Sequence, residues 1–128
     1  MKDNRRRKSI MNKHELAAIA KVTHQTNKAF CEINGDFSQV DWCFAPDWQR
    51  ESAMNGVKFH YEDPNASSEQ SHMNWFREKQ LDGWTYGPVK NAEKKEHPCM
   101  VPYDQLSKHQ RIKDALFKAV VRAILDAR

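Results

Sequence analysis

The sequence predicts a mainly helical fold with minor β structure, with about four helices packed against two or three short strands. Two observations support this prediction. Apolar residues recur at helical spacing in two long segments, one near each end of the chain. Between these segments, isolated glycines and prolines divide the chain into short elements. A chain of 128 residues has the length of one domain and needs no disulfide or metal to support its core.

The first half of the chain predicts two helices and a strand. The first helix is predicted over residues 13–34, with Gly35 at the position where a left-handed residue commonly ends a helix. A short second helix is predicted over 46–55, because proline suits the first helical turn and Gly56 follows as a stop. Apolar and polar residues then alternate over 57–61, which predicts a short strand.

The next segment predicts a third helix and a second strand. The helix begins at Ser67 or Ser68, either of which suits the N-cap, and ends before Gly83. Residues 84–86 form a predicted short strand that stops at a Gly-Pro pair. Residues 88–100 are predicted to be a polar loop.

A final helix is the strongest periodic signal in the chain. Ser107 and Gln110 have the spacing of a capping box at its start. Its core-facing side is predicted from apolar residues at helical spacing: Ile112, Ala115, Leu116, Ala119, Val120, Ala123 and Ile124.

Positive charge is concentrated at the N-terminus. Residues 1–13 carry six basic side chains and one acidic side chain, a net charge of +5, whereas the whole chain carries +4. The rest of the chain therefore sums to −1. We expect a flexible basic arm over 1–12 and a single domain over 13–128. Because the domain itself has no basic footprint, a nucleic-acid partner is not expected, although DNA association through the arm stays open as an alternative.

Cysteine usage and hydropathy favour a cytoplasmic protein. Three scattered cysteines do not form a disulfide framework, and their odd number favours a reducing compartment. No apolar run approaches the roughly 20 residues of a membrane span, and no apolar segment follows the basic N-terminus as in a signal peptide. Metals and other cofactors are not expected, since His97 and Cys99 have no second ligand pair at zinc spacing.

Three motifs follow one another in an aromatic-rich segment, with Trp75 upstream. They are Gly83-Trp84-Thr85-Tyr86-Gly87, Lys95-Glu96-His97-Pro98 and Val101-Pro102-Tyr103-Asp104. In this order they resemble the RyR domain, the repeat named after the ryanodine receptors, in its small single-repeat bacterial or phage form. The resemblance covers about 45–124, so the helix over 13–34 is an addition to it. It implies a mainly helical binding domain and neither channel activity nor catalytic residues.

The same segment supplies the candidates for a ligand site. Aromatic faces stack on planar ligands, and a lysine or arginine beside them binds a phosphate or carboxylate. A histidine held by a following proline can donate a hydrogen bond to the same group. Each of these residues is also explained by packing or by loop structure alone. The candidate ligand-binding residues are Trp84, Tyr86, Lys95, His97, Tyr103 and Arg50.

The sequence therefore predicts a non-enzymatic binding module that recognises a small molecule or a protein partner. The more specific version of this hypothesis is a nucleotide-like anionic ligand. An enzyme is not expected, because no nucleophile–base pair is apparent. Two alternatives stay open: a structural protein that self-associates, for example as a homodimer, and a DNA-associated protein that uses its basic arm.

Overall fold

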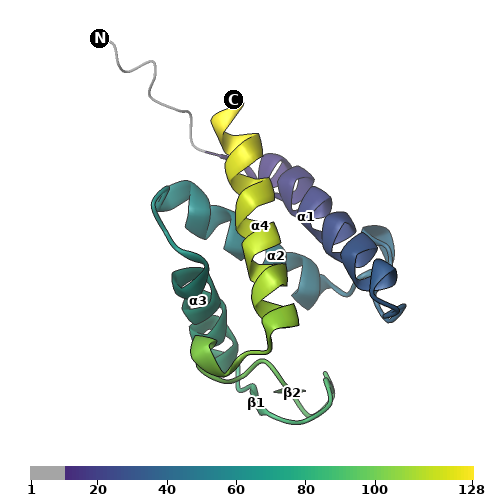
Figure 1. Ribbon diagram of the computed structural model, residues 1–128. Coiled ribbons are helices and arrows are strands. Elements are labelled where there is room, and N and C mark those ends of the chain that lie inside the picture. The colour runs from purple at the N-terminus through teal and green to yellow at the C-terminus, as the bar shows by residue number, and fades with distance from the viewer. Residues whose placement is uncertain (1–10) are drawn as a thin grey trace.

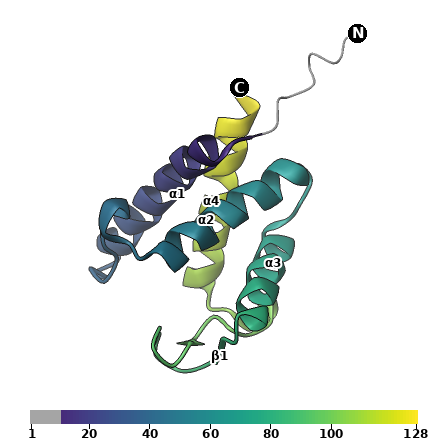
Figure 2. The ribbon, with the colours of Figure 1, turned by 180° about the vertical axis from the view of Figure 1, so that it is seen from behind.

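Four helices and one very small sheet make up the computed structural model, which describes residues 11–128 (Figure 1). The predicted mainly α fold with minor β structure is confirmed. Seen from behind, α2 crosses α4 and lies between α1 and α3 (Figure 2). The helices are α1 (Lys13–Ile33), α2 (Asp47–Glu62), α3 (Ser68–Leu81) and α4 (Lys108–Asp126), the strands are β1 (Thr85–Tyr86) and β2 (Glu96–His97), and two 3-10 turns cover Trp42–Phe44 and Tyr103–Gln105.

The main core forms where α1, α2 and α4 meet. Ile19 and Ala20 of α1, Val57 of α2 and Val121 of α4 are buried in one cluster. Met11 is buried in the same cluster, although it belongs to the predicted arm. Residues 1–10 of that arm lie outside the described residues. The helix that the sequence adds to the family resemblance is thus part of the central core.

Capping residues fix where the helices begin. Asn12 starts α1 and Ser67 starts α3, each in a reciprocal capping box with the residue three positions later. Ser107 accepts a hydrogen bond from the backbone N–H of Gln110 at the start of α4. Gly83 follows α3 with φ +90°, a backbone conformation that glycine adopts without strain. The predicted helix over residues 13–34 and the predicted ends of α3 are thereby confirmed.

The predicted stop at Gly56 and the predicted strand over 57–61 are wrong, because α2 continues to Glu62. Val57 and His60, three residues apart, are both buried on one face of this helix. Gly56 serves packing rather than termination: a Cβ atom at this position would lie 2.8 Å from Cζ of Phe117 on α4. Glycine therefore allows α4 to approach α2 closely at this point.

The core-facing side of α4 is also displaced from the predicted one. Val121 and Leu125 are buried and Phe117 packs against the same core, at spacings of four residues. Ile112, in contrast, is 38% exposed, and Ala115, Ala119 and Ala123 face solvent. The prediction counted alanines as apolar markers, whereas the larger side chains determine which face is buried.

The two strands pair in parallel, with Thr85 opposite Glu96 and Tyr86 opposite His97. β1 confirms the predicted strand, but β2 lies in the segment that was predicted to be loop throughout. Lys95, at φ +54°, precedes β2, and its Nζ donates to the carbonyl oxygen of Asp82 at 2.8 Å. The sheet thus fixes the segment that carries His97 against the end of α3. None of the described helices combines the length and the apolarity that a membrane crossing requires.

Candidate functional site

A cavity of about 270 Å³ lies among the four helices and the segment that follows β1. This volume is just below the roughly 300–1,000 Å³ of typical small-molecule sites, and aromatic side chains form much of the wall. Its lining includes Thr23 and His24 from α1, Trp48 from α2, His72, Trp75, Glu78 and Lys79 from α3, Trp84, Lys90, His97 and Cys99 from the β region, and Lys113, Asp114 and Phe117 from α4.

Three tryptophans and a histidine form the aromatic part of the wall. The ring centroids of Trp48 and Trp84 are 5.1 Å apart, and those of Trp75 and His97 are 5.1 Å apart in an edge-to-face arrangement. Trp84 is only 4% exposed, and its indole N–H donates to Asp82 at 3.3 Å. The aromatic wall is therefore fixed by packing and by a hydrogen bond before any ligand enters.

Lys79 is a buried cation to which the described residues supply no ion-pair partner. Only 5% of the residue is exposed, and its Nζ lies 5.1 Å from the ring centroid of Trp48 and 5.6 Å from that of Trp84. Within the described part of the chain, this ammonium forms no ion pair and no hydrogen bond. Burial lowers the pKa of Lys79 from its usual range, against the opposing effect of nearby Glu78 and Asp82. The cation is thus held mainly by the tryptophan faces.

Two further lysines make this cavity positively charged. The ammonium of Lys90 lies 5.3 Å from the ring centroid of Trp48, although the residue as a whole is exposed. The pKa of Lys90 is lowered, first by loss of hydration at its side chain and then by the charges of Lys113 and Lys79. Three ammonium groups close enough to affect one another favour the entry of an anion.

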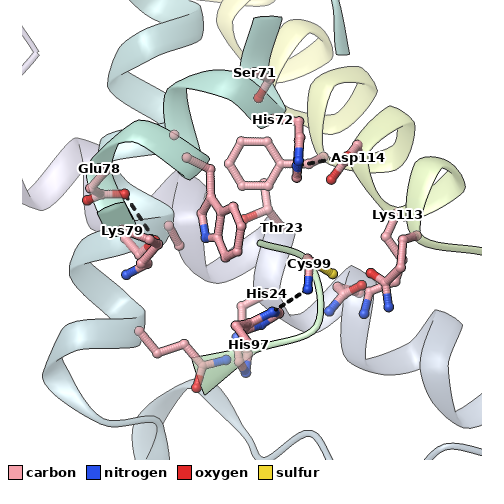
Figure 3. A pocket seen from close by; sticks show the side chains of 18 of the residues that line it. Thr23, His24, Ser71, His72, Glu78, Lys79, His97, Cys99, Lys113 and Asp114 are labelled. Atoms are coloured by element: carbon pink, nitrogen blue, oxygen red, sulfur yellow. Dashed lines mark hydrogen bonds and ion pairs between the residues drawn. The ribbon is translucent and has the colours of Figure 1, made fainter. Parts of the chain in front are cut away.

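His97 is a neutral hydrogen-bond donor in this wall. Burial lowers its pKa to about 4, with smaller contributions from the cations Lys90, Lys113 and Lys79. Its Nδ1 accepts a hydrogen bond from the backbone N–H of Cys99 at 3.0 Å (Figure 3). Because Nδ1 of the neutral ring is an acceptor, Nε2 carries the proton and can donate to a bound group.

Asp114 of α4 is an acidic residue of the cavity and lies near His72 of α3. Burial raises the pKa of Asp114 to about 6, although the charges of His72 and Lys113 act in the opposite direction. Its Oδ2 is buried and has no hydrogen-bond partner, and the nearest basic atom is Nδ1 of His72 at 3.9 Å. Figure 3 shows Asp114 and His72 on the side of the cavity away from Lys79.

Of the six predicted ligand-binding residues, the structure brings two into the cavity. Trp84 and His97 both line it, with ring centroids 6.3 Å apart. Tyr86 is 57% exposed, and Lys95 is held by Asp82, so neither lines the cavity.

The other two predicted residues lie outside the lining as well. Arg50 forms an ion pair with Asp47 at 2.6 Å on the first turn of α2. Tyr103 packs near His72, with ring centroids 6.1 Å apart, but does not reach the cavity.

Lys79 and Asp114 line the cavity but are not among the residues predicted from the sequence. A usable signal existed for the first: His72, Trp75 and Lys79 follow one another at helical spacing on one face of α3. A lysine at an apolar position of such a face indicates a buried cation. For Asp114 no such signal exists, because its neighbours on α4 do not distinguish it from a solvent-facing carboxylate.

The described residues contain no group of three or more His, Cys, Asp or Glu side chains that could hold a metal ion. Cys99 beside His97 is not prepared for nucleophilic chemistry either. Burial raises the pKa of its thiol to about 11, so the sulfur is protonated at neutral pH.

These features define a class of protein: a small helical domain in which a two-stranded parallel sheet closes an aromatic and cationic cavity. The model of the RyR domain family matches residues 61–126, just over half of the chain, and the protein belongs to that family. The resemblance inferred from the sequence motifs is thereby confirmed. The matched region supplies α3, both strands and α4, whereas Trp48 and the α1 residues of the cavity precede it.

Proposed function

We propose that this RyR domain is a non-enzymatic binding module whose cavity takes a nucleotide-like small molecule, an aromatic ring bearing an anionic group. The single observation that carries the proposal is Lys79. A buried ammonium without an ion pair or a hydrogen bond is costly, and cation–π contacts offset only part of that cost. An anion bound next to Lys79 supplies the missing ion-pair partner.

The surroundings of Lys79 match the rest of such a ligand. Trp48 and Trp84 present aromatic faces beside the ammonium, and such faces stack on planar rings. The Nε2–H of His97 and the ammonium groups of Lys90 and Lys113 lie around the same cavity as further donors and charges. Anion recognition and ring stacking are thus available in one site.

The chemistry of the lining favours binding over catalysis. Cys99 is a protonated thiol, and His97 is a weak base because its pKa is about 4. A general base active at neutral pH needs a pKa closer to 7. This combination supports the non-enzymatic part of the proposal.

A cytoplasmic setting is part of the proposal. Cys31, Cys43 and Cys99 are all free thiols, a state that a reducing compartment maintains.

A matched panel of ligands tests the proposed function. Nucleoside 5′-monophosphates and the corresponding nucleosides share the ring and differ in the anionic group. A monophosphate present at one hundred times its dissociation constant should add about 2.7 kcal/mol to the free energy of unfolding, measured by thermal shift. The nucleoside should add much less at the same concentration. The proposal would be contradicted if the nucleosides stabilised the protein as much as the monophosphates, or if no member of either series bound.

A further inference from the structure

The carboxylate of Asp114 is an acceptor that the protein leaves unused. The side chain is 30% exposed, yet its Oδ2 is buried and has no hydrogen-bond partner. Within the described chain, no donor is placed to satisfy either carboxylate oxygen. Buried polar atoms are nearly always hydrogen-bonded in folded proteins, so the unpartnered Oδ2 requires an explanation. The exposed part of the side chain makes Asp114 reachable from the cavity that it lines.

His72, whose ring is the nearest basic group to Oδ2, does not supply the missing donor. Its Nε2 lies 2.8 Å from the carbonyl oxygen of Val101, and a carbonyl only accepts, so Nε2 is the donor of that bond. Its Nδ1 lies 3.9 Å from Oδ2 of Asp114, which is beyond hydrogen-bond distance. His72 therefore does not satisfy the carboxylate, which is left for a group that enters the cavity.

Asp114 and Lys79 lie on different sides of the cavity. Figure 3 shows Lys79 on the left, next to Glu78, and Asp114 on the right, beside α4, and both residues line the same space. A ligand that spans the cavity with its anionic group at Lys79 can present an edge of its ring to Asp114.

We propose that Asp114 is a specificity-determining residue that accepts a hydrogen bond from an N–H donor on the ring of the ligand. The site then selects aromatic anions that carry an amino group or a comparable donor on the edge opposite the anionic group. This inference rests on the proposed function and adds to it the identity of the group that is read at the second end of the site.

Two nucleotides that differ in one donor test the inference. Adenosine 5′-monophosphate carries an amino group on its ring, and purine riboside 5′-monophosphate lacks it. We expect the full-length protein to bind the first at least about tenfold more tightly in calorimetric titrations, the effect of one hydrogen bond to a charged acceptor. In Asp114→Leu this preference should disappear, and in Asp114→Asn, which keeps one acceptor oxygen, it should be reduced.

Lys79→Met distinguishes a failure of this inference from a failure of the proposed function. This variant should weaken the binding of both nucleotides by similar factors and leave the preference between them intact. An equal preference in the wild type and in Asp114→Leu would overturn the inference, as would equal affinity of the wild type for the two nucleotides. Both of these results leave the anion site in place. If neither nucleotide bound the wild type, the inference would fall together with the proposed function.

Discussion

Replacing Trp84 by alanine is expected to lower the free energy of unfolding by about 3–5 kcal/mol, the usual cost of removing a buried large aromatic side chain. Trp84 is 4% exposed and contacts Trp48 and His97. Its removal also exposes the ammonium of Lys79 to a void in place of an aromatic face. Urea unfolding followed by circular dichroism measures the change.

Two matched variants control for this result. Trp84→Phe keeps an aromatic ring and should lose clearly less stability than the alanine variant. Tyr86→Ala, two residues away and 57% exposed, should change the free energy of unfolding by no more than about 0.5 kcal/mol. A loss below about 1 kcal/mol in Trp84→Ala would show that the aromatic wall is not part of the supporting core.

A fall in pH is expected to change the free energy of unfolding through two cavity residues, and their effects have opposite signs. The pKa of His97 falls from 6.5 to about 4 on folding. Its contribution to the free energy of unfolding is therefore present above pH 6.5 and is lost as the pH falls through 4. This loss amounts to about 3 kcal/mol at 1.36 kcal/mol per pKa unit. The pKa of Asp114 rises from 3.8 to about 6, so its contribution is present below pH 3.8 and is lost as the pH rises through 6.

The two effects oppose each other between pH 6 and pH 4, and single variants separate them. Asp114→Asn should be more stable than the wild type at pH 7.5 and should lose stability more steeply on acidification. His97→Asn should reverse the slope of the free energy of unfolding against pH, so that this variant gains stability toward pH 4.5. Urea unfolding at several pH values measures both, with the exposed His14→Asn as a control. Identical pH profiles for the wild type and both cavity variants would contradict this account.

The sequence was sufficient where local chemistry determines the structure. Ser67 and Gly83 bound α3 because a capping hydroxyl and a left-handed glycine act within a few residues of themselves. The segment 57–61 was misassigned because a short apolar run suits a strand and a buried helix equally well. In the structure this segment is the last part of α2, which packs closely against α4 where Gly56 meets Phe117.

The candidate site was predictable only in part for a related reason. Trp84 and His97 belong to a motif that is visible in the chain, and both line the cavity. The importance of Lys79 depends on the lack of an ion pair or hydrogen bond to its ammonium within the described residues, and that of Asp114 on the lack of a donor for its Oδ2. Such absences are properties of the folded environment and leave no mark on neighbouring residues. Lys95, chosen as the cation from the motif, instead holds the loop through Asp82.

The central claim is that Lys79 is the anion-binding residue of the cavity, and calorimetric titration of Lys79→Met tests it most directly. Methionine keeps an apolar chain between Trp48 and Trp84 and removes the charge, so the variant should fold and be no less stable than the wild type. It should bind the tightest nucleoside monophosphate of the panel about 10–150-fold more weakly, the effect of losing a charged hydrogen bond. Lys94→Met, in an exposed loop lysine, should bind it unchanged. Wild-type affinity in Lys79→Met would contradict the account.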